Sequence, residues 1–266
     1  MAPMAFPTTR PATDAEPVKR SPWRYSRYIA HRCGGALAPE NTLAGLPLAA
    51  RLGFRAVEFD VMLSADGTPL LIHDETLERT TDGSGRVAET PLARLCQLDA
   101  GHRFHRAYAG ERLPTLQQTL DACLALGLAA NIEIKPAAGL EAETGAAVAR
   151  LVETSAQRWQ DVPLLFSSFS EPALAAAREA APTLPRALLV KAIPADWPAR
   201  LRNLECHALH CVARHLQPEQ AQEITAAGYP LACYTVNRPE DAARLFAAGV
   251  AAIITDRLDL FDPLRA

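Results

Sequence analysis

Short apolar runs alternate with longer stretches of mixed apolar and polar residues along most of this chain. Short apolar runs bounded by turn residues predict buried strands, and the longer stretches between them predict helices. Eight strands are predicted, at 28–30, 57–63, 129–134, 164–167, 187–190, 208–210, 231–235 and 251–254. Eight parallel strands in alternation with helices form an α/β fold of the (β/α)8 TIM-barrel type. A doubly wound open sheet is the alternative, because alternation alone does not show closure.

The predicted helices occupy the gaps between these strands. They lie at 41–52, 115–126, 140–159, from 171 onward, 197–204, 218–227 and 239–248. We expect Asn41 to cap the first helix, because an asparagine side chain can accept the free amide hydrogens of a helix start, and Gly53 to end it. The segment 75–114 follows an Asp-Gly hairpin and shows neither the apolar spacing of a helix nor the alternation of a strand. It predicts a small insertion after the second strand of the barrel, lying over a site.

Length, composition and charge fit one domain of this kind. A chain of 266 residues with 49% hydrophobic and 21% charged side chains can bury a core of barrel size. We expect the barrel to span 28–260 and residues 1–21 to be a disordered tail. The net charge of −3 does not provide the excess of basic residues typical of proteins that bind nucleic acid or associate stably with membranes. The sequence has no apolar run of signal-peptide or membrane-spanning length, which predicts a cytoplasmic protein.

The cysteines carry no obvious site. Six of them lie among apolar neighbours, without a Cys-x-x-Cys pair. This scatter predicts buried small side chains, and argues against disulfides, redox chemistry or zinc binding.

Acidic side chains gather on the second and third predicted strands. Side chains alternate faces along a strand, so Glu58 and Asp60 share a face opposite an apolar row, and Glu133 is placed in the same way on the strand at 129–134. An acidic inner face is costly in a sheet covered on both sides unless its charge is neutralised. We therefore predict that the three carboxylates bind one divalent cation, Mg, Mn or Ca. A solvated strand face is the alternative.

Other polar residues fall where the predicted strands end, the face at which barrel enzymes build their sites. His31 and His73 could serve as a general base and a general acid, since the reference pKa of histidine is about 6.5. Arg32 and Lys135 could offset charge on a phosphoryl group. The same rim also holds Ser167, Ser168, Tyr234 and Asn237. These residues predict metal-assisted acid–base chemistry on an anionic substrate, for which a phosphorylated compound fits best. The remaining histidines are expected to be structural, namely His102, His105, His207, His210 and His215.

An ordered set of short motifs carries a family resemblance. In chain order the motifs are Ile29-Ala30-His31-Arg32, Ala38-Pro39-Glu40-Asn41-Thr42, Val57-Glu58-Phe59-Asp60, His73-Asp74, Asn131-Ile132-Glu133-Ile134-Lys135-Pro136, Ser167-Ser168-Phe169, Tyr234-Thr235-Val236-Asn237 and Thr255-Asp256. From about Tyr28 to Leu260 the chain resembles the glycerophosphodiester phosphodiesterase family, most closely its bacterial cytoplasmic members linked to glycerol 3-phosphate uptake. The resemblance implies a (β/α)8 barrel with a small insertion after the His-Asp pair.

The resemblance also implies a reaction and a role for each site residue. The three carboxylates would hold a divalent ion, with His31 as the base and His73 as the acid. Arg32 and Lys135 would hold the phosphate, with Tyr234 beside them as a substrate-binding residue. The reaction would be hydrolysis of a deacylated phospholipid, such as glycerophosphocholine or glycerophosphoethanolamine, to glycerol 3-phosphate and an alcohol. A neighbouring glycerol hydroxyl attacking first, to give a cyclic phosphate, is the alternative first step.

One position departs from the family pattern. The family usually reads His-Arg-Gly, and this chain has Cys33 in place of the glycine. A backbone conformation open mainly to glycine would strain a cysteine there. We expect reduced tolerance at this turn without loss of activity.

Two rival functions are less well supported. A lyase or phospholipase D-like relative acting on intact lipids should show secretion, an apolar rim or disulfides, and a non-catalytic barrel that senses phosphodiesters should lack a histidine or a carboxylate. The sequence shows none of these features. It leaves open the preferred head group, the physiological metal and the oligomeric state, a homo-oligomer included.

Overall fold

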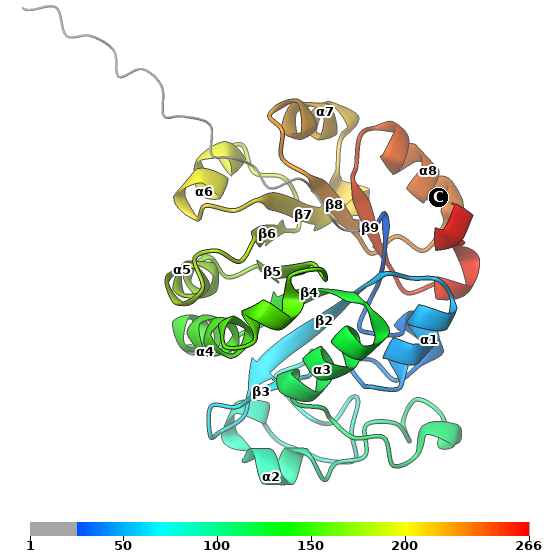
Figure 1. The fold of residues 1–266 in the computed structure, drawn as a ribbon, viewed down its shortest axis with the longest axis vertical. Coiled ribbons are helices and arrows are strands. Elements are labelled where there is room, and N and C mark those ends of the chain that lie inside the picture. The colour runs from blue at the N-terminus through cyan, green and yellow to red at the C-terminus, as the bar shows by residue number, and fades with distance from the viewer. Residues whose placement is uncertain (1–25, 266) are drawn as a thin grey trace, which may run out of the picture.

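A computed structural model describes residues 26–265, in which a barrel of parallel strands is surrounded by helices (Figure 1). The parallel strands are β1 (Tyr28–Ala30), β2 (Ala56–Leu63), β4 (Ala129–Ile134), β5 (Leu164–Ser168), β6 (Arg186–Val190), β7 (Ala208–Val212), β8 (Leu231–Tyr234) and β9 (Ala252–Thr255). The ring closes because β1 pairs in parallel with both β9 and β2. The predicted (β/α)8 barrel is confirmed, and this closure rules out the open sheet.

The main helices follow the strands in the predicted order. They are α1 (Gly45–Arg51), α3 (Leu116–Leu126), α4 (Glu141–Glu153), α5 (Glu171–Ala180), α6 (Trp197–Asn203), α7 (Pro218–Ala226) and α8 (Pro239–Ala247). Local chemistry sets several of their ends. Thr115 and Gln118 form a capping box at the start of α3, and Gly127 ends that helix in the left-handed conformation.

The start of α1 differs from the prediction. The helix begins at Gly45 and not at Asn41, whose backbone is left-handed with φ 56°. The Asn41 side chain is used elsewhere: its Nδ2 donates to Asp60 Oδ2 at 2.8 Å, and its Oδ1 accepts from the Asp60 amide at 3.1 Å. Asn41 therefore supports the acidic strand instead of capping a helix.

The helix predicted at 140–159 is also shorter than expected. The helix α4 ends at Glu153, and a separate 3-10 helix, η4 (Ala156–Trp159), follows it. The hydroxyls of Thr154 and Ser155 donate to the carbonyls of Leu151 and Val152. Such local bonds compete with continuation of the backbone ladder, which accounts for the break.

The long connection after β2 packs as a small layer beside the barrel. It begins with β3 (Pro69–Leu71), which pairs antiparallel with β2, and contains η2 (Val87–Glu89), α2 (Leu92–Leu95) and η3 (Arg106–Tyr108). In Figure 1 it lies below the barrel, next to α3. Its buried apolar side chains pack with Met62 of β2 in a cluster separate from the main core. We propose to treat 75–114 as the insertion and 28–260 as the barrel domain; the predicted tail, 1–21, lies outside the described residues.

The two faces of the strands have different neighbours. On β2 the outward-facing Val57, Phe59 and Val61 are fully buried in a cluster with side chains of the surrounding helices. The bottom of the barrel interior is filled by small and branched side chains, namely Ile29, Ala56, Ala129, Ala232, Ala252 and Ile254. The inward positions that follow along β2 and β4 are polar, so the acidic side chains collect at the C-terminal end of the barrel.

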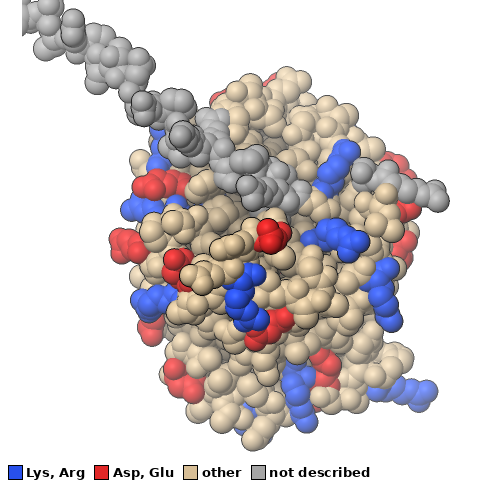
Figure 2. Space-filling view, viewed as in Figure 1, with Lys and Arg blue, Asp and Glu red and all other residues tan. Residues whose placement is uncertain are grey.

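The cysteines and the surface complete this description. Five of the six cysteines are buried, Cys96 is partly exposed, and all six are free thiols. Acidic and basic side chains are interspersed over the face shown in Figure 2. Within residues 26–265, no helix combines the length and the apolar character needed to cross a membrane.

Candidate active site

Three carboxylates meet inside the C-terminal end of the barrel. In the parallel pairing of β2 with β4, Asp60 stands opposite Glu133, and Glu58 lies two residues earlier on the same face of β2. An oxygen of each of the three residues lies within 4.8 Å of the others. All three are buried, with 2%, 2% and 8% of Glu58, Asp60 and Glu133 exposed. The structure thus brings together the three residues predicted to bind a metal.

The charges of this group are strongly perturbed. Burial, together with the charge of Asp60, raises the pKa of Glu58 to about 7. Burial and the two neighbouring carboxylates also raise the pKa of Glu133 well above its usual value. Burial acts in the same direction on Asp60, but Lys135 and other cations outweigh it and hold the pKa of Asp60 below its usual range. Asp60 is therefore the residue of the three that most readily carries a negative charge.

One oxygen of this group has no internal partner. Glu58 Oε1 is buried and accepts no hydrogen bond from the described residues. Its other oxygen accepts the Arg32 amide at 3.0 Å. A buried carboxylate oxygen without a donor is uncommon and needs an explanation. Three converging hard oxygen donors, one of them unpartnered, fit a divalent cation of the Mg, Mn or Ca type.

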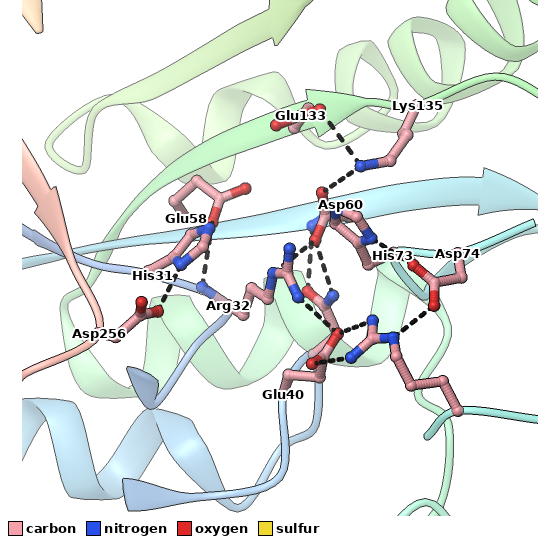
Figure 3. A network of polar contacts seen from close by, with 12 residues as sticks. His31, Arg32, Glu40, Glu58, Asp60, His73, Asp74, Glu133, Lys135 and Asp256 are labelled. Carbon is pink, nitrogen blue, oxygen red and sulfur yellow. Dashed lines mark hydrogen bonds and ion pairs between the residues drawn. The ribbon is translucent and has the colours of Figure 1, made fainter. Parts of the chain in front are cut away.

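His31 lies at one side of the carboxylates, immediately after β1 (Figure 3). Its Nδ1 is 2.6 Å from Asp256 Oδ1, and its Nε2 is 3.8 Å from Glu58 Oε2. Asn237 fixes Asp256 in turn, donating to its carboxylate at 3.1 Å and accepting from its amide at 2.8 Å. Burial acts to lower the pKa of His31, but the bond to Asp256 and the charge of Glu58 outweigh it and raise that pKa. Since a carboxylate accepts, Nδ1 carries a hydrogen and Nε2 faces the acidic group.

His73 lies on the other side of Asp60 (Figure 3). Its Nδ1 is 2.6 Å from Asp74 Oδ1. Arg79 donates to the second oxygen of Asp74, and its two terminal nitrogens donate to Glu40 at 2.7 Å each. Burial lowers the pKa of His73. The two histidines are thus arranged alike, each with Nδ1 on a carboxylate that another side chain holds in place.

Arg32 and Lys135 border the carboxylates and are partly exposed to solvent. Arg32 Nη1 donates to Glu40 at 2.8 Å, and its Nε is 3.5 Å from Asp60 Oδ2. Lys135 Nζ is 3.6 Å from Asp60 Oδ1 and 3.9 Å from Glu133 Oε1. Their side chains are 20% and 25% exposed, so both cations can also face a ligand that enters from solvent.

The turn after β1 adopts the glycine-like conformation expected there. Arg32 and Cys33 both have positive φ, 48° and 72°. The Cys33 amide donates to the Glu58 carbonyl at 2.9 Å, and the Gly35 amide donates to the His31 carbonyl at 2.7 Å. Cys33 is fully buried. The turn folds His31 and Arg32 back over β2, at the cost of left-handed backbone in two non-glycine residues.

The remaining predicted rim residues have other contacts. The Tyr234 hydroxyl donates to the Val190 carbonyl at 2.9 Å, so the tyrosine presents its ring and not its hydroxyl. The ring packs edge to face with Phe169, with centroids 6.0 Å apart. The Ser168 hydroxyl donates to the Ile134 carbonyl at 2.6 Å. Ser167 is fully buried in β5 next to Glu133.

Several residues of this network had no role assigned from the sequence. They are Glu40, Asp74, Arg79 and Asp256. Asp256 follows the last strand and so shares the rim of the other site residues, a signal that sequence reasoning could have used. Arg79 comes from the irregular segment, and only the folded chain brings it near Glu40, which is 39 residues away.

Comparison with known proteins adds an independent line of support. A sequence model of the Glycerophosphoryl diester phosphodiesterase family matches residues 31–260. The chain belongs to this family. A glycerophosphodiester phosphodiesterase from Caldanaerobacter subterraneus subsp. tengcongensis is 36% identical over 229 residues, which cover 86% of this chain and 93% of that relative. The family predicted from the sequence motifs is therefore confirmed.

Solved structures of similar proteins agree with this assignment. A phosphodiesterase from Oleispira antarctica, in complex with the product sn-glycerol-3-phosphate, is 42% identical with a TM-score of 0.85, covering 91% of this chain and 98% of that one. A glycerophosphodiester phosphodiesterase from Agrobacterium tumefaciens is 29% identical with a TM-score of 0.73, covering 89% and 99%. The similarity extends over nearly the whole length of both.

Proposed function

We propose that this protein is a metal-dependent glycerophosphodiester phosphodiesterase, which hydrolyses deacylated phospholipids to glycerol 3-phosphate and an alcohol. The observation that carries the proposal is the buried group of Glu58, Asp60 and Glu133 between His31 and His73. Membership of the family and the likeness to a structure that holds sn-glycerol-3-phosphate support the choice of substrate.

The three carboxylates would hold the divalent cation. Their oxygens converge, and Glu58 Oε1 has no hydrogen-bond partner among residues 26–265. Burial and the charge of neighbouring carboxylates raise the pKa of Glu58 and of Glu133, and a positive ion would counter that repulsion. When bound, such an ion acts as a Lewis acid toward phosphoryl oxygens. Mg, Mn and Ca all accept this donor set, completed by water.

Arg32 and Lys135 would bind the substrate phosphate. The distances from Lys135 Nζ to the two carboxylates, 3.6 and 3.9 Å, are those of ion pairs and not of hydrogen bonds. Within the described part of the chain its N–H groups therefore remain able to donate to phosphate oxygens. Both cations lie where negative charge would develop on the phosphoryl group, and positioned charges of this kind stabilise such a transition state. The ring of Tyr234 would flank the substrate.

The two histidines would move the protons. One accepts a proton from the attacking water while the new P–O bond forms, and the other gives a proton to the alcohol oxygen as its P–O bond breaks. The sequence-based hypothesis makes His31 the base. The bond to Asp256 and the charge of Glu58 raise the pKa of His31, whereas burial lowers that of His73, and a divalent cation beside Glu58 would counter the rise at His31. Either order consumes one water and returns the pair to its starting state after proton exchange with solvent.

The direct test is product formation by the purified chain. We expect release of glycerol 3-phosphate from glycerophosphocholine, abolished by EDTA and restored by Mg, Mn or Ca. The choline product should appear in equal amount. Binding of glycerophosphocholine by the folded protein without product, under every metal, would instead favour a phosphodiester-sensing barrel.

A further inference from the structure

A pocket opens beside the proposed catalytic centre on the side of β4 and β5. Its volume is about 600 Å³, and it shares Glu133 and Lys135 with the metal and phosphate site. A phosphodiester has two arms, and one bound at Lys135 can place one of them in this pocket. If the protein has the function proposed above, this pocket is positioned to discriminate between substrates by the arm that it binds.

The walls of the pocket are held by a close contact between two helices. The helices α4 and α5 pack so tightly that a Cβ placed on Gly145 would lie 2.1 Å from the Ala173 carbonyl oxygen. This approach brings the first residues of the two helices, Glu141 and Glu171, to the same pocket. Two carboxylates therefore line the pocket from two closely packed helices, α4 and α5.

Part of the pocket lining is apolar or aromatic, namely Pro136, Phe169 and Pro172. Phe169 keeps 45% of its surface exposed, although it is a large apolar side chain, and it lines this pocket. Its edge-to-face contact with Tyr234 fixes the orientation of the ring, since the Tyr234 hydroxyl is itself bonded to Val190. An exposed aromatic ring offers a face to a cation, worth about 0.5–1 kcal/mol at an exposed position.

The two carboxylates differ in how far they are already neutralised. Glu171 forms an ion pair with Arg200 at 3.3 Å. Glu141 accepts only the Gly139 amide, at 3.2 Å, and no Lys or Arg among residues 26–265 forms an ion pair with it. Glu141 therefore gives the pocket a carboxylate that forms no ion pair with a cation of residues 26–265.

We propose that this pocket is the site for the alcohol arm of the substrate and that it selects alcohols bearing a cationic ammonium group. Phe169 would contact the apolar methyl or methylene groups and the ammonium charge, and Glu141 would balance that charge. A glycerol arm carries no positive charge, so it gains neither the cation–π contact with Phe169 nor the charge balance with Glu141. The preferred substrates would be glycerophosphocholine and glycerophosphoethanolamine.

A purely structural role for Glu141 predicts a different result. A carboxylate in the first turn of a helix interacts favourably with the helix dipole, and α4 has two of them, Glu141 and Glu143. Only Glu141 lines the pocket, whereas Glu143 is exposed. Glu143→Gln is therefore a matched control that loses the same dipole interaction without changing the pocket.

The test compares kcat/KM for glycerophosphocholine with kcat/KM for glycerophosphoglycerol, whose head group is neutral. We expect wild type to prefer the choline substrate, and Glu141→Gln to lower the ratio of the two values by about threefold to tenfold. Phe169→Leu, which keeps an apolar side chain but removes the ring, should lower the same ratio. Glu143→Gln should leave the ratio at the wild-type value.

A ratio that Glu141→Gln and Phe169→Leu leave at the wild-type value would overturn the assignment of the pocket, even with both substrates hydrolysed. So would a wild-type preference for the neutral head group. Failure to hydrolyse either substrate would count against the proposed function itself, so the two failures are distinct. Inhibition by choline compared with its neutral isostere 3,3-dimethylbutan-1-ol gives a second readout, in which choline should inhibit wild type more strongly than the isostere.

Discussion

His31 and His73 each have Nδ1 on a carboxylate, but their proposed roles differ. General acid–base catalysis contributes about 10²- to 10⁴-fold, so replacing either residue by alanine should lower kcat by about 10²-fold or more. An activated p-nitrophenyl leaving group needs no protonation, so it should rescue only the variant that lacks the acid. His102→Ala, on an exposed side chain outside this network, is the control. Rescue of both variants, or of neither, would contradict an acid–base pair.

Cys33 allows the backbone conformation of the site turn to be tested alone. At φ 72° a glycine is favoured over alanine by about 1 kcal/mol, so Cys33→Gly should leave the protein more stable than Cys33→Ala. Cys123 is also buried, but lies within the helix α3, where alanine should be the more stable replacement. Urea unfolding of Cys33→Gly, Cys33→Ala, Cys123→Gly and Cys123→Ala measures whether glycine is the more stable replacement at position 33 and alanine at position 123. The same order at both positions would show that the turn is unstrained.

At the scale of elements, the contact between α4 and α5 sets the pocket wall. Gly145 lies inside a helix, where alanine normally adds about 1 kcal/mol of stability. Here the added methyl would meet the Ala173 carbonyl at 2.1 Å, so we expect Gly145→Ala to destabilise the protein by about 1–3 kcal/mol. Ala142→Gly, at an exposed position of the same helix, measures the propensity effect alone. A gain in stability in Gly145→Ala would mean that the helices are not in close contact.

Element positions were predictable where local pattern decides them, and less so where tertiary contacts do. The eight barrel strands follow from short apolar runs, and Thr115 and Gly127 mark the ends of α3 as their chemistry predicts. Asn41 has the chemistry of a helix cap, but its side chain bonds to Asp60, 19 residues away. Likewise Arg79 bonds to Glu40 as well as to nearby Asp74, and no local pattern joins Arg79 to Glu40. The alternation of side chains along each strand was enough to place the three carboxylates on one face. It does not reveal Asp256 and Asp74, the side chains that hold the two histidines.

At the scale of the whole molecule, the acidic centre links stability, pH and metal. The pKa of Glu58 is raised to about 7 and that of Glu133 well above its usual value. The folded metal-free chain therefore binds these protons more tightly than the unfolded chain does. The contribution of both groups to stability is fully present below the unfolded pKa of about 4.5. That of Glu58 is lost as the pH rises through about 7, and that of Glu133 as the pH rises through its own raised pKa.

A divalent cation should replace these protons, so its stabilising effect should grow over the same range of pH. We expect the increase in Tm on adding Mn to be larger at about pH 8 than at about pH 5. Glu133→Gln should reduce this increase. An equal shift in Tm at both pH values would argue that the ion binds elsewhere.

The most direct test of the whole account is a titration of metal-free protein with Mn, following bound metal and release of glycerol 3-phosphate from glycerophosphocholine in the same samples. The account predicts no release without metal, and activity that rises in proportion to occupancy of a single site. Glu133→Gln should move both curves together to higher Mn, whereas Glu143→Gln should move neither. Full activity in the metal-free protein, or metal binding that Glu133→Gln leaves unchanged, would contradict it.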